Sequence, residues 1–113
     1  MLRGCWIERR GADTLTMRWF PDGAFWRGEW IRYPAGAGAP ETARYRIAET
    51  PAGWQVCGAR EDRCWPLDVT LPTLADDPPE RMTVWASETA LHVEINARDG
   101  ADVVFRGARD GCD

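Results

Sequence analysis

Three groups of side chains in this sequence could carry chemistry: carboxylates, one serine with one histidine, and arginines interleaved with tryptophans. Glu8, Glu29 and Glu94 lie on strand-like segments whose alternation would turn all three to one side, as a glycosidase pair of carboxylates requires. With 18 acidic residues among 113, such triples arise freely and are weak support for hydrolysis. Ser87 and His92 are the only serine and histidine, and no nucleophile elbow surrounds Ser87. We expect that the protein is not an enzyme.

The mixture of arginine and tryptophan on strand faces is the stronger indication of function. One face of each strand in a barrel points inward, and polar side chains there need partners or a wet cavity. Such an interior would suit a small amphipathic or carboxylate-bearing ligand. The candidate ligand-binding residues are Arg18, Trp26, Arg27, Trp30, Arg44, Arg46 and Trp54. Alternatively, these arginines face solvent, stack on exterior tryptophans and pair with Glu29 or Glu49, each pair contributing under about 1 kcal/mol.

The four cysteines have spacings that do not suit a metal site. Six residues separate Cys57 from Cys64, whereas zinc ligands are usually separated by about two to four, and the chain has one histidine. Cys57 and Cys64 near the base of a hairpin could form a disulfide, which leaves Cys5 with Cys112. The second bridge would close a loop of about a hundred residues and contribute up to about 4.7 kcal/mol. The alternative is four reduced, buried thiols in a cytosolic protein.

The elements that carry these residues are expected to be strands. Short runs rich in Trp, Val, Ile, Thr and Tyr are separated by Gly, Pro and Asp, and no long segment has helical periodicity. Gly28, central in one run, indicates a bulge or sharp bend. The proline-rich residues 70–82 are expected to be irregular. The predicted strands are 5–10, 14–20, 24–33, 43–50, 53–58, 64–69, 82–87, 90–97 and 101–107.

Sequential hairpins of this kind favour closure of the sheet. About eight or nine strands make an antiparallel up-and-down meander, which must close or leave an exposed edge. We therefore expect an all-β fold, closed or nearly closed into a small barrel, with residues 1–113 as one domain. Pairing of the first strand with the last would bring Cys5 and Cys112 together.

The motif Gly4-Cys5-Trp6 resembles the Gly-x-Trp signature that opens the first strand of lipocalins and related calycin barrels. It is also similar to the start of small bacterial lipocalin-like domains. In that family the tryptophan plugs the closed end of the barrel and an arginine from a late strand packs over its ring. The resemblance implies structural roles for Gly4 and Trp6, with Arg106 as the candidate arginine. A contact between the cation and the ring would contribute about 0.5 to 2 kcal/mol.

Charge and composition restrict the kinds of binding partner and the cellular compartment that we expect for this protein. A net charge of -4 and a pI of about 5.0 argue against nucleic acid or an anionic membrane as the main partner. No apolar run approaches the roughly 18 residues of a membrane span, and no nucleotide-binding glycine motif or other cofactor site is evident. Two disulfides would imply a periplasmic or secreted location, with the leader peptide outside this sequence.

Two functions follow from these observations. The first is a non-catalytic barrel that binds a small apolar or carboxylate-bearing ligand. The second is a secreted or periplasmic protein-binding module, an inhibitor or assembly subunit, whose barrel is filled. Seven tryptophans exceed what so small a core needs, so some should be exposed and mark an interface.

Overall fold

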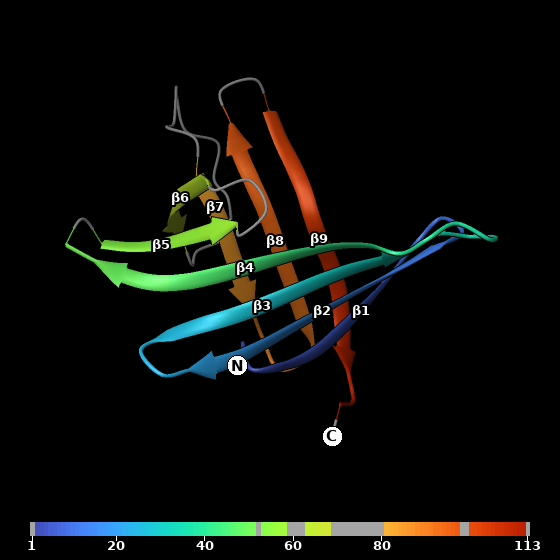
Figure 1. The fold of residues 1–113 in the computed structure, drawn as a ribbon, viewed down its shortest axis with the longest axis horizontal. Coiled ribbons are helices and arrows are strands. Elements are labelled where there is room, and N and C mark those ends of the chain that lie inside the picture. The colour runs from blue at the N-terminus through green and yellow to red at the C-terminus, as the bar shows by residue number, and fades with distance from the viewer. Residues whose placement is uncertain (1, 52, 59–62, 69–80, 98–99, 113) are drawn as a thin grey trace.

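The computed structural model describes residues 2–51, 53–58, 63–68, 81–97 and 100–112. Nine strands in these ranges form a closed barrel (Figure 1). Their bounds are β1 Gly4–Arg10, β2 Asp13–Asp22, β3 Phe25–Tyr33, β4 Glu41–Thr50, β5 Gly53–Gly58, β6 Arg63–Asp68, β7 Arg81–Ala86, β8 Ala90–Ala97 and β9 Gly100–Asp110. The predicted all-β class and barrel closure are confirmed. The described residues include no helix that is long and apolar enough to cross a membrane.

The barrel differs from the expected antiparallel meander at one pair of neighbouring strands. Neighbouring strands are antiparallel all around the ring except β6 and β7, which run parallel. A ring with an odd number of strands cannot alternate direction throughout, so at least one parallel pair is unavoidable. Here that pair joins Leu67 to Met82 and Asp68 to Thr83. Most of the segment expected to be irregular, residues 69–80, lies outside the described residues.

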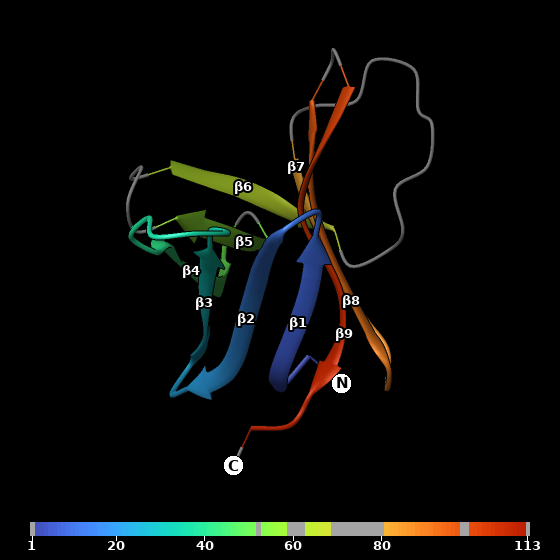
Figure 2. The same cartoon turned by 90° about the vertical axis from the view of Figure 1, so that its right-hand side faces the viewer.

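The strands form two groups that cross. In Figure 1, β2, β3 and β4 run across the view in front of β7, β8 and β9, which cross them steeply. Figure 2, turned by 90°, shows β3 and β4 on one side of the molecule and β7 and β8 on the other. Side chains from the inward faces of both groups therefore meet between them and form the core.

Alternation along each strand selects the core residues. In β2, Leu15, Met17 and Trp19 are fully buried, whereas Arg18 between them is exposed. This division of β2 into two faces follows from the alternation of apolar and polar residues that its sequence shows. The buried apolar cluster contains Trp6, Leu15, Met17, Trp19, Ile47, Val56, Trp65, Met82, Val84, Leu91, Val93 and Phe105. These large side chains fill the middle of the barrel.

Gly28 allows a close approach and marks no bulge. The register of β3 with both β2 and β4 is continuous through Gly28, so the expected bulge is wrong. A Cβ atom at Gly28 would lie 2.6 Å from the ring of Trp19. The indole therefore lies directly against the strand, which only glycine permits. A register shift does occur elsewhere, between Val93 and Glu94 of β8.

Both predicted disulfides are present. Cys5 and Cys112 are bonded with their Cα atoms 5.6 Å apart, beside the ladder that pairs β1 with β9. Cys57 and Cys64 are bonded from directly opposed positions on β5 and β6. No cysteine is free, so the alternative of four reduced thiols is wrong for this structure.

Polar side chains continue the seam where the backbone ladder between β1 and β9 stops. A carboxylate oxygen of Glu8 accepts a hydrogen bond of 2.8 Å from the backbone N–H of Arg106. Arg10 donates two hydrogen bonds of 2.9 Å to Glu8 and longer ones of 3.5 Å to the carbonyls of Val103 and Val104. The charged residues that follow the first tryptophan in the sequence therefore join the two ends of the sheet.

An arginine from β9 covers the first tryptophan, but it is Arg109 and not Arg106. The Arg109 guanidinium lies 4.0 Å from the centroid of the buried Trp6 ring. The expectation for Arg106 is wrong because strand alternation turns it to the outer face, where its Nε donates to His92 Nδ1 at 3.3 Å. Arg109 lies four residues from the buried Phe105 and so shares its strand face.

Backbone carbonyls hold the Arg109 guanidinium in place. It donates to the carbonyl oxygens of Arg3, Ser87 and Glu88 at 2.9, 3.1 and 2.8 Å. Gly4 has a φ of 135°, and a Cβ there would lie 2.7 Å from Arg109 Nη1. The glycine of the motif is therefore required both by its backbone conformation and by the arginine beside it.

Candidate binding sites

Three hollows lined by described residues lie away from the middle of the barrel. Buried side chains such as Met17, Trp19 and Phe105 fill that middle. Two hollows open at opposite ends of the barrel, and a third lies on the outer face of β3 to β6. Each has a different chemical character.

The first hollow, of about 650 Å³, lies at the end of the barrel where β3 begins and β7 ends. We call it the tryptophan hollow; it is lined by Leu2, Trp26, Ile47, Trp54, Leu67, Val84, Trp85 and Ala86. Apart from the indole N–H groups, these lining side chains are entirely apolar. Trp54 remains 46% exposed, which makes it one of the two most exposed large apolar side chains in the described residues.

Strand pairing and a tight turn position the tryptophans of this hollow. Trp26 of β3 lies directly opposite Ile47 of β4, on the inward face. Trp54 follows the turn between β4 and β5, where Thr50 Oγ1 donates to the Gly53 carbonyl at 2.8 Å. Gly53 has a φ of 113°, which favours glycine at this turn. The two indoles therefore reach the same hollow from separate strands.

An apolar hollow of this size can bury an apolar or aromatic ligand. Small-molecule sites usually measure about 300 to 1,000 Å³ and are lined mainly by apolar and aromatic side chains. Covering about 100 Å² of exposed apolar surface would contribute about 2.5 kcal/mol. The described lining residues offer indole N–H donors but no charged side chain, so the hollow would select for apolar character rather than for an ionised group.

The second hollow, of about 380 Å³, lies at the opposite end of the barrel. We call it the polar mouth; it surrounds Arg10, Trp30, Arg32, Glu41, Tyr45 and Trp65. Arg32 Nη2 lies 2.7 Å from a Glu41 oxygen, and Arg10 Nε lies 2.9 Å from Glu8. Since both arginines already have carboxylate partners, a ligand carboxylate would have to displace those partners.

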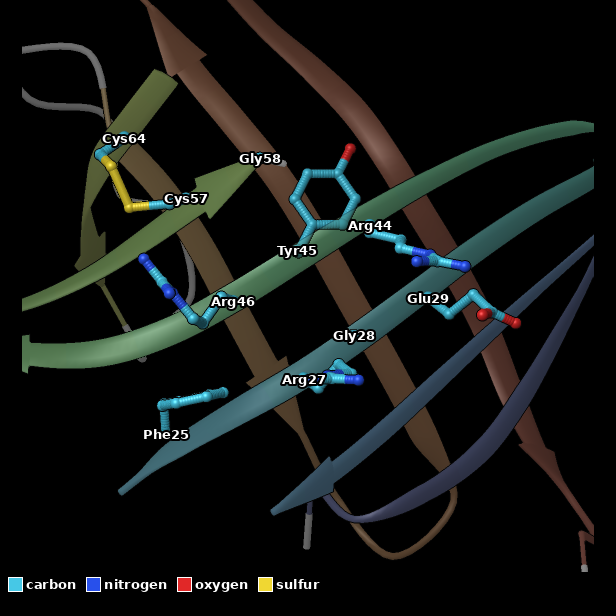
Figure 3. Close-up of a pocket in the computed structure, with 10 residues that line it drawn as sticks. All are labelled: Phe25, Arg27, Gly28, Glu29, Arg44, Tyr45, Arg46, Cys57, Gly58 and Cys64. Atoms are coloured by element: carbon cyan, nitrogen blue, oxygen red, sulfur yellow. A yellow bond between two sulfur atoms is a disulfide. The ribbon is translucent and has the colours of Figure 1, made fainter. Parts of the chain in front are cut away.

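The third hollow is a groove of about 510 Å³ on the outer face of the sheet. We call it the arginine groove; it is lined by Phe25, Arg27, Gly28, Glu29, Arg44, Tyr45, Arg46, Cys57, Gly58 and Cys64. Figure 3 shows Arg46 extending toward the Cys57–Cys64 disulfide, whereas Arg44 extends away from it. The Arg46 guanidinium lies 5.4 Å from the centroid of the Phe25 ring. All three arginines are exposed.

The candidate ligand-binding residues are divided among these hollows. Trp26 and Trp54 meet in the tryptophan hollow, whereas Trp30 lies in the polar mouth and donates to the Val104 carbonyl at 3.2 Å. Arg27, Arg44 and Arg46 line the arginine groove, and Arg44 also borders the polar mouth. Arg18 is exposed, with its guanidinium 5.1 Å from the Phe20 ring. The four arginines therefore face outward, and two of them, Arg18 and Arg46, stack on phenylalanine rather than tryptophan.

Sequence reasoning missed part of the tryptophan hollow. Leu2, Leu67, Val84 and Trp85 line it but were not among the candidates. Alternation within the predicted strand 82–87 could have indicated Val84. Alternation could not have indicated that β6 lies beside β7, because that arrangement depends on the parallel pairing of the two strands.

Most of the side chains that could carry catalysis have structural partners in the fold. Glu8 belongs to the seam and Glu29 to the arginine groove, while Glu94 is buried and lies 3.1 Å from His92 Nε2. Ser87 Oγ accepts hydrogen bonds from backbone N–H groups of its own turn, at 3.0 and 3.3 Å. Within the described residues, no group of three or more His, Cys, Asp or Glu side chains could hold a metal ion.

Comparison of the chain with protein-family models, with curated proteins and with solved structures gives no match.

Proposed function

We propose that the protein is a non-catalytic binding barrel that holds a small apolar or aromatic ligand in the tryptophan hollow. The supporting observation is the lining of this hollow, in which Trp26, Trp54 and Trp85 surround an open volume of about 650 Å³ with no charged side chain among the described residues. An exposed apolar concavity of this kind is costly in water and usually marks a binding site. A carboxylate-bearing ligand has less support at the polar mouth, because Arg10 and Arg32 there already pair with Glu8 and Glu41.

A lipocalin-like origin is part of this proposal. The closed barrel, the Gly4-Cys5-Trp6 motif and the packing of Arg109 over Trp6 support it. The tryptophan hollow lies at one end of the barrel and not in its interior. Leu2 lines the hollow, and its carbonyl accepts a hydrogen bond of 3.3 Å from the Trp6 indole. The ligand would therefore sit in a cup at the plugged end of the barrel. The two disulfides favour a periplasmic or secreted location for such a protein.

Titration with the neutral probe N-phenyl-1-naphthylamine, followed by tryptophan quenching and probe emission, tests the proposal. We expect saturable binding that Trp54→Ala weakens by about tenfold or more, because the loss of one large apolar wall removes about 1.5 to 3 kcal/mol of burial. Tyr33→Ala is the matched control: Tyr33 is 44% exposed, similar to Trp54, but lies outside the hollow. Equal affinities for the two variants, or no saturable binding across a panel of apolar ligands, would contradict the proposal.

A second function, a protein-binding module, is supported by the filled middle of the barrel and by the exposure of Trp54 and Tyr33. Exposed aromatic side chains are frequent anchors of interfaces. A pull-down from the native extract distinguishes the two functions. Retention of a partner by the wild type and its loss with Trp54→Ala, together with no binding of small apolar probes, would favour the module.

A further inference from the structure

The arginine groove contains two like charges placed directly opposite each other. Arg27 of β3 and Arg46 of β4 are register partners on the outer face. Like charges at directly opposed positions destabilise a sheet. Opposite charges could have occupied these positions without altering the fold, since both side chains are exposed. The pair therefore suggests a role other than stability.

Acidic side chains balance only part of the positive charge of the arginine groove. Among the described residues that line it, three are arginine and one is glutamate, although the whole chain has a net charge of -4. Arg27 Nη2 lies 2.7 Å from an Asp22 oxygen, but these side chains are 66% and 47% exposed, so this pair is weak and easily exchanged. In the part of the chain that the structure describes, neither Arg44 nor Glu29 takes part in an ion pair.

The arginine beside the disulfide is held before any ligand arrives. The Phe25 ring, 5.4 Å from the Arg46 guanidinium, supports one face of that planar group. Cys57 is the register partner of Arg46, and its disulfide to Cys64 fixes the adjacent wall of the groove (Figure 3). Restricting a side chain in this way lowers the entropy that binding must remove.

We propose that the arginine groove binds a dianionic oxyanion, namely phosphate or a phosphate monoester. Two guanidinium groups on neighbouring strands present planar sets of N–H donors, which match the several oxygens and the double charge of such a group. A carboxylate has two oxygens and one charge, and would satisfy only one of the two arginines. The site is separate from the tryptophan hollow, because Arg27 and its neighbour Trp26 point to opposite faces of β3.

Titration of the full chain with inorganic phosphate and with phenyl phosphate, at about pH 7.5 where both are largely dianionic, tests this proposal. Backbone amide shifts in NMR spectra at fixed ionic strength measure affinity and locate the site. We expect saturable shifts in β3, β4 and β5, with affinity reduced about tenfold or more by Arg27→Gln or Arg46→Gln. Arg18→Gln is the matched control, since Arg18 is also exposed on the outer face but does not line the groove.

The titrations distinguish a phosphate monoester from free phosphate, and two of their possible results would contradict the proposal. Tighter binding of phenyl phosphate than of inorganic phosphate would assign a phosphate monoester, and equal binding would assign free phosphate. Benzoate binding as tightly as phosphate would overturn the requirement for a dianion. An effect of Arg18→Gln equal to that of Arg46→Gln would show diffuse charge attraction and overturn the site. Unchanged circular dichroism spectra would confirm that the variants are folded, and Trp54→Ala should leave phosphate binding unchanged.

Discussion

The two ends of the barrel are built by the same strands, yet one is lined by apolar side chains and the other by paired charges. At the tryptophan hollow, backbone pairing and the Cys5–Cys112 disulfide close the seam between β1 and β9. At the polar mouth, Glu8 and Arg10 close it through their side chains. The first end leaves apolar surface in contact with water, whereas at the second end Arg10 and Arg32 already have carboxylate partners.

This contrast indicates which end has unused capacity for binding. A charge that already has a partner gains little from a ligand, because the ligand must first replace that partner. Exposed apolar surface gains whenever a ligand removes it from water. An opening of the barrel is therefore not by itself evidence of a ligand site, and the state of its lining side chains in the free protein decides between the two ends.

The largest expected effect concerns the disulfide at the apolar end. The double variant Cys5→Ser/Cys112→Ser should lower the free energy of unfolding by about 3 to 5 kcal/mol, because the bond closes a long loop in the unfolded chain. Urea denaturation without reductant measures this. The matched variant Cys57→Ser/Cys64→Ser opens a loop with a sequence separation of only 7, against 107, and should cost about 2 to 3 kcal/mol. The reverse ranking would contradict the role given to the seam.

An intermediate effect is expected for the arginine that covers Trp6. Arg109→Ala removes the contact with the indole ring and the hydrogen bonds to backbone carbonyls, and should lower the free energy of unfolding by about 2 to 3 kcal/mol. Arg106→Ala, the matched control on the same strand, should cost under about 1 kcal/mol. Thermal and urea denaturation would compare them. Similar losses for both variants would mean that the contact with Trp6 does not stabilise this end.

The smallest effect is expected at the polar mouth. Arg32→Gln breaks the ion pair with Glu41, whose side chains are 44% and 48% exposed, and should cost under about 1 kcal/mol. Glu41→Gln should give the same small change, and both should disappear in about 1 M salt. Urea denaturation at low and high salt measures the difference. A loss above about 2 kcal/mol would show that the polar mouth contributes as much to stability as the apolar end.

Local patterns in the sequence predicted most of the strands. The alternation in β2 identified its buried face, and Gly23, whose φ is 63°, lies in the turn between two strands that the sequence indicated. The disulfides followed from hairpin geometry and barrel closure. These features depend on neighbours in the sequence or on a single global condition, the closure of the sheet, so they could be inferred without coordinates.

Features that depend on the relative placement of strands could not be predicted in this way. The parallel joint follows from the number of strands, which the sequence indicated only approximately. The choice between Arg106 and Arg109 depends on which face of β9 turns inward, and the spacing from Phe105 is the signal that could have settled it. The grouping of arginines on the outer face requires the register of β3 with β4, which brings Arg27 opposite Arg46.

The parallel pairing of β6 with β7 has a consequence for how a ligand could enter the tryptophan hollow. Residue pairing between β6 and β7 in the described chain is short, from Leu67 with Met82 to Asp68 with Thr83, and parallel pairing is slightly less stable per residue. Backbone amide hydrogens between β6 and β7 should therefore exchange with solvent before those of the longer antiparallel ladders. Leu67 and Val84 belong to the two strands of this joint and also line the tryptophan hollow. Transient parting of the two strands would provide a side entrance for ligands wider than the hollow at rest.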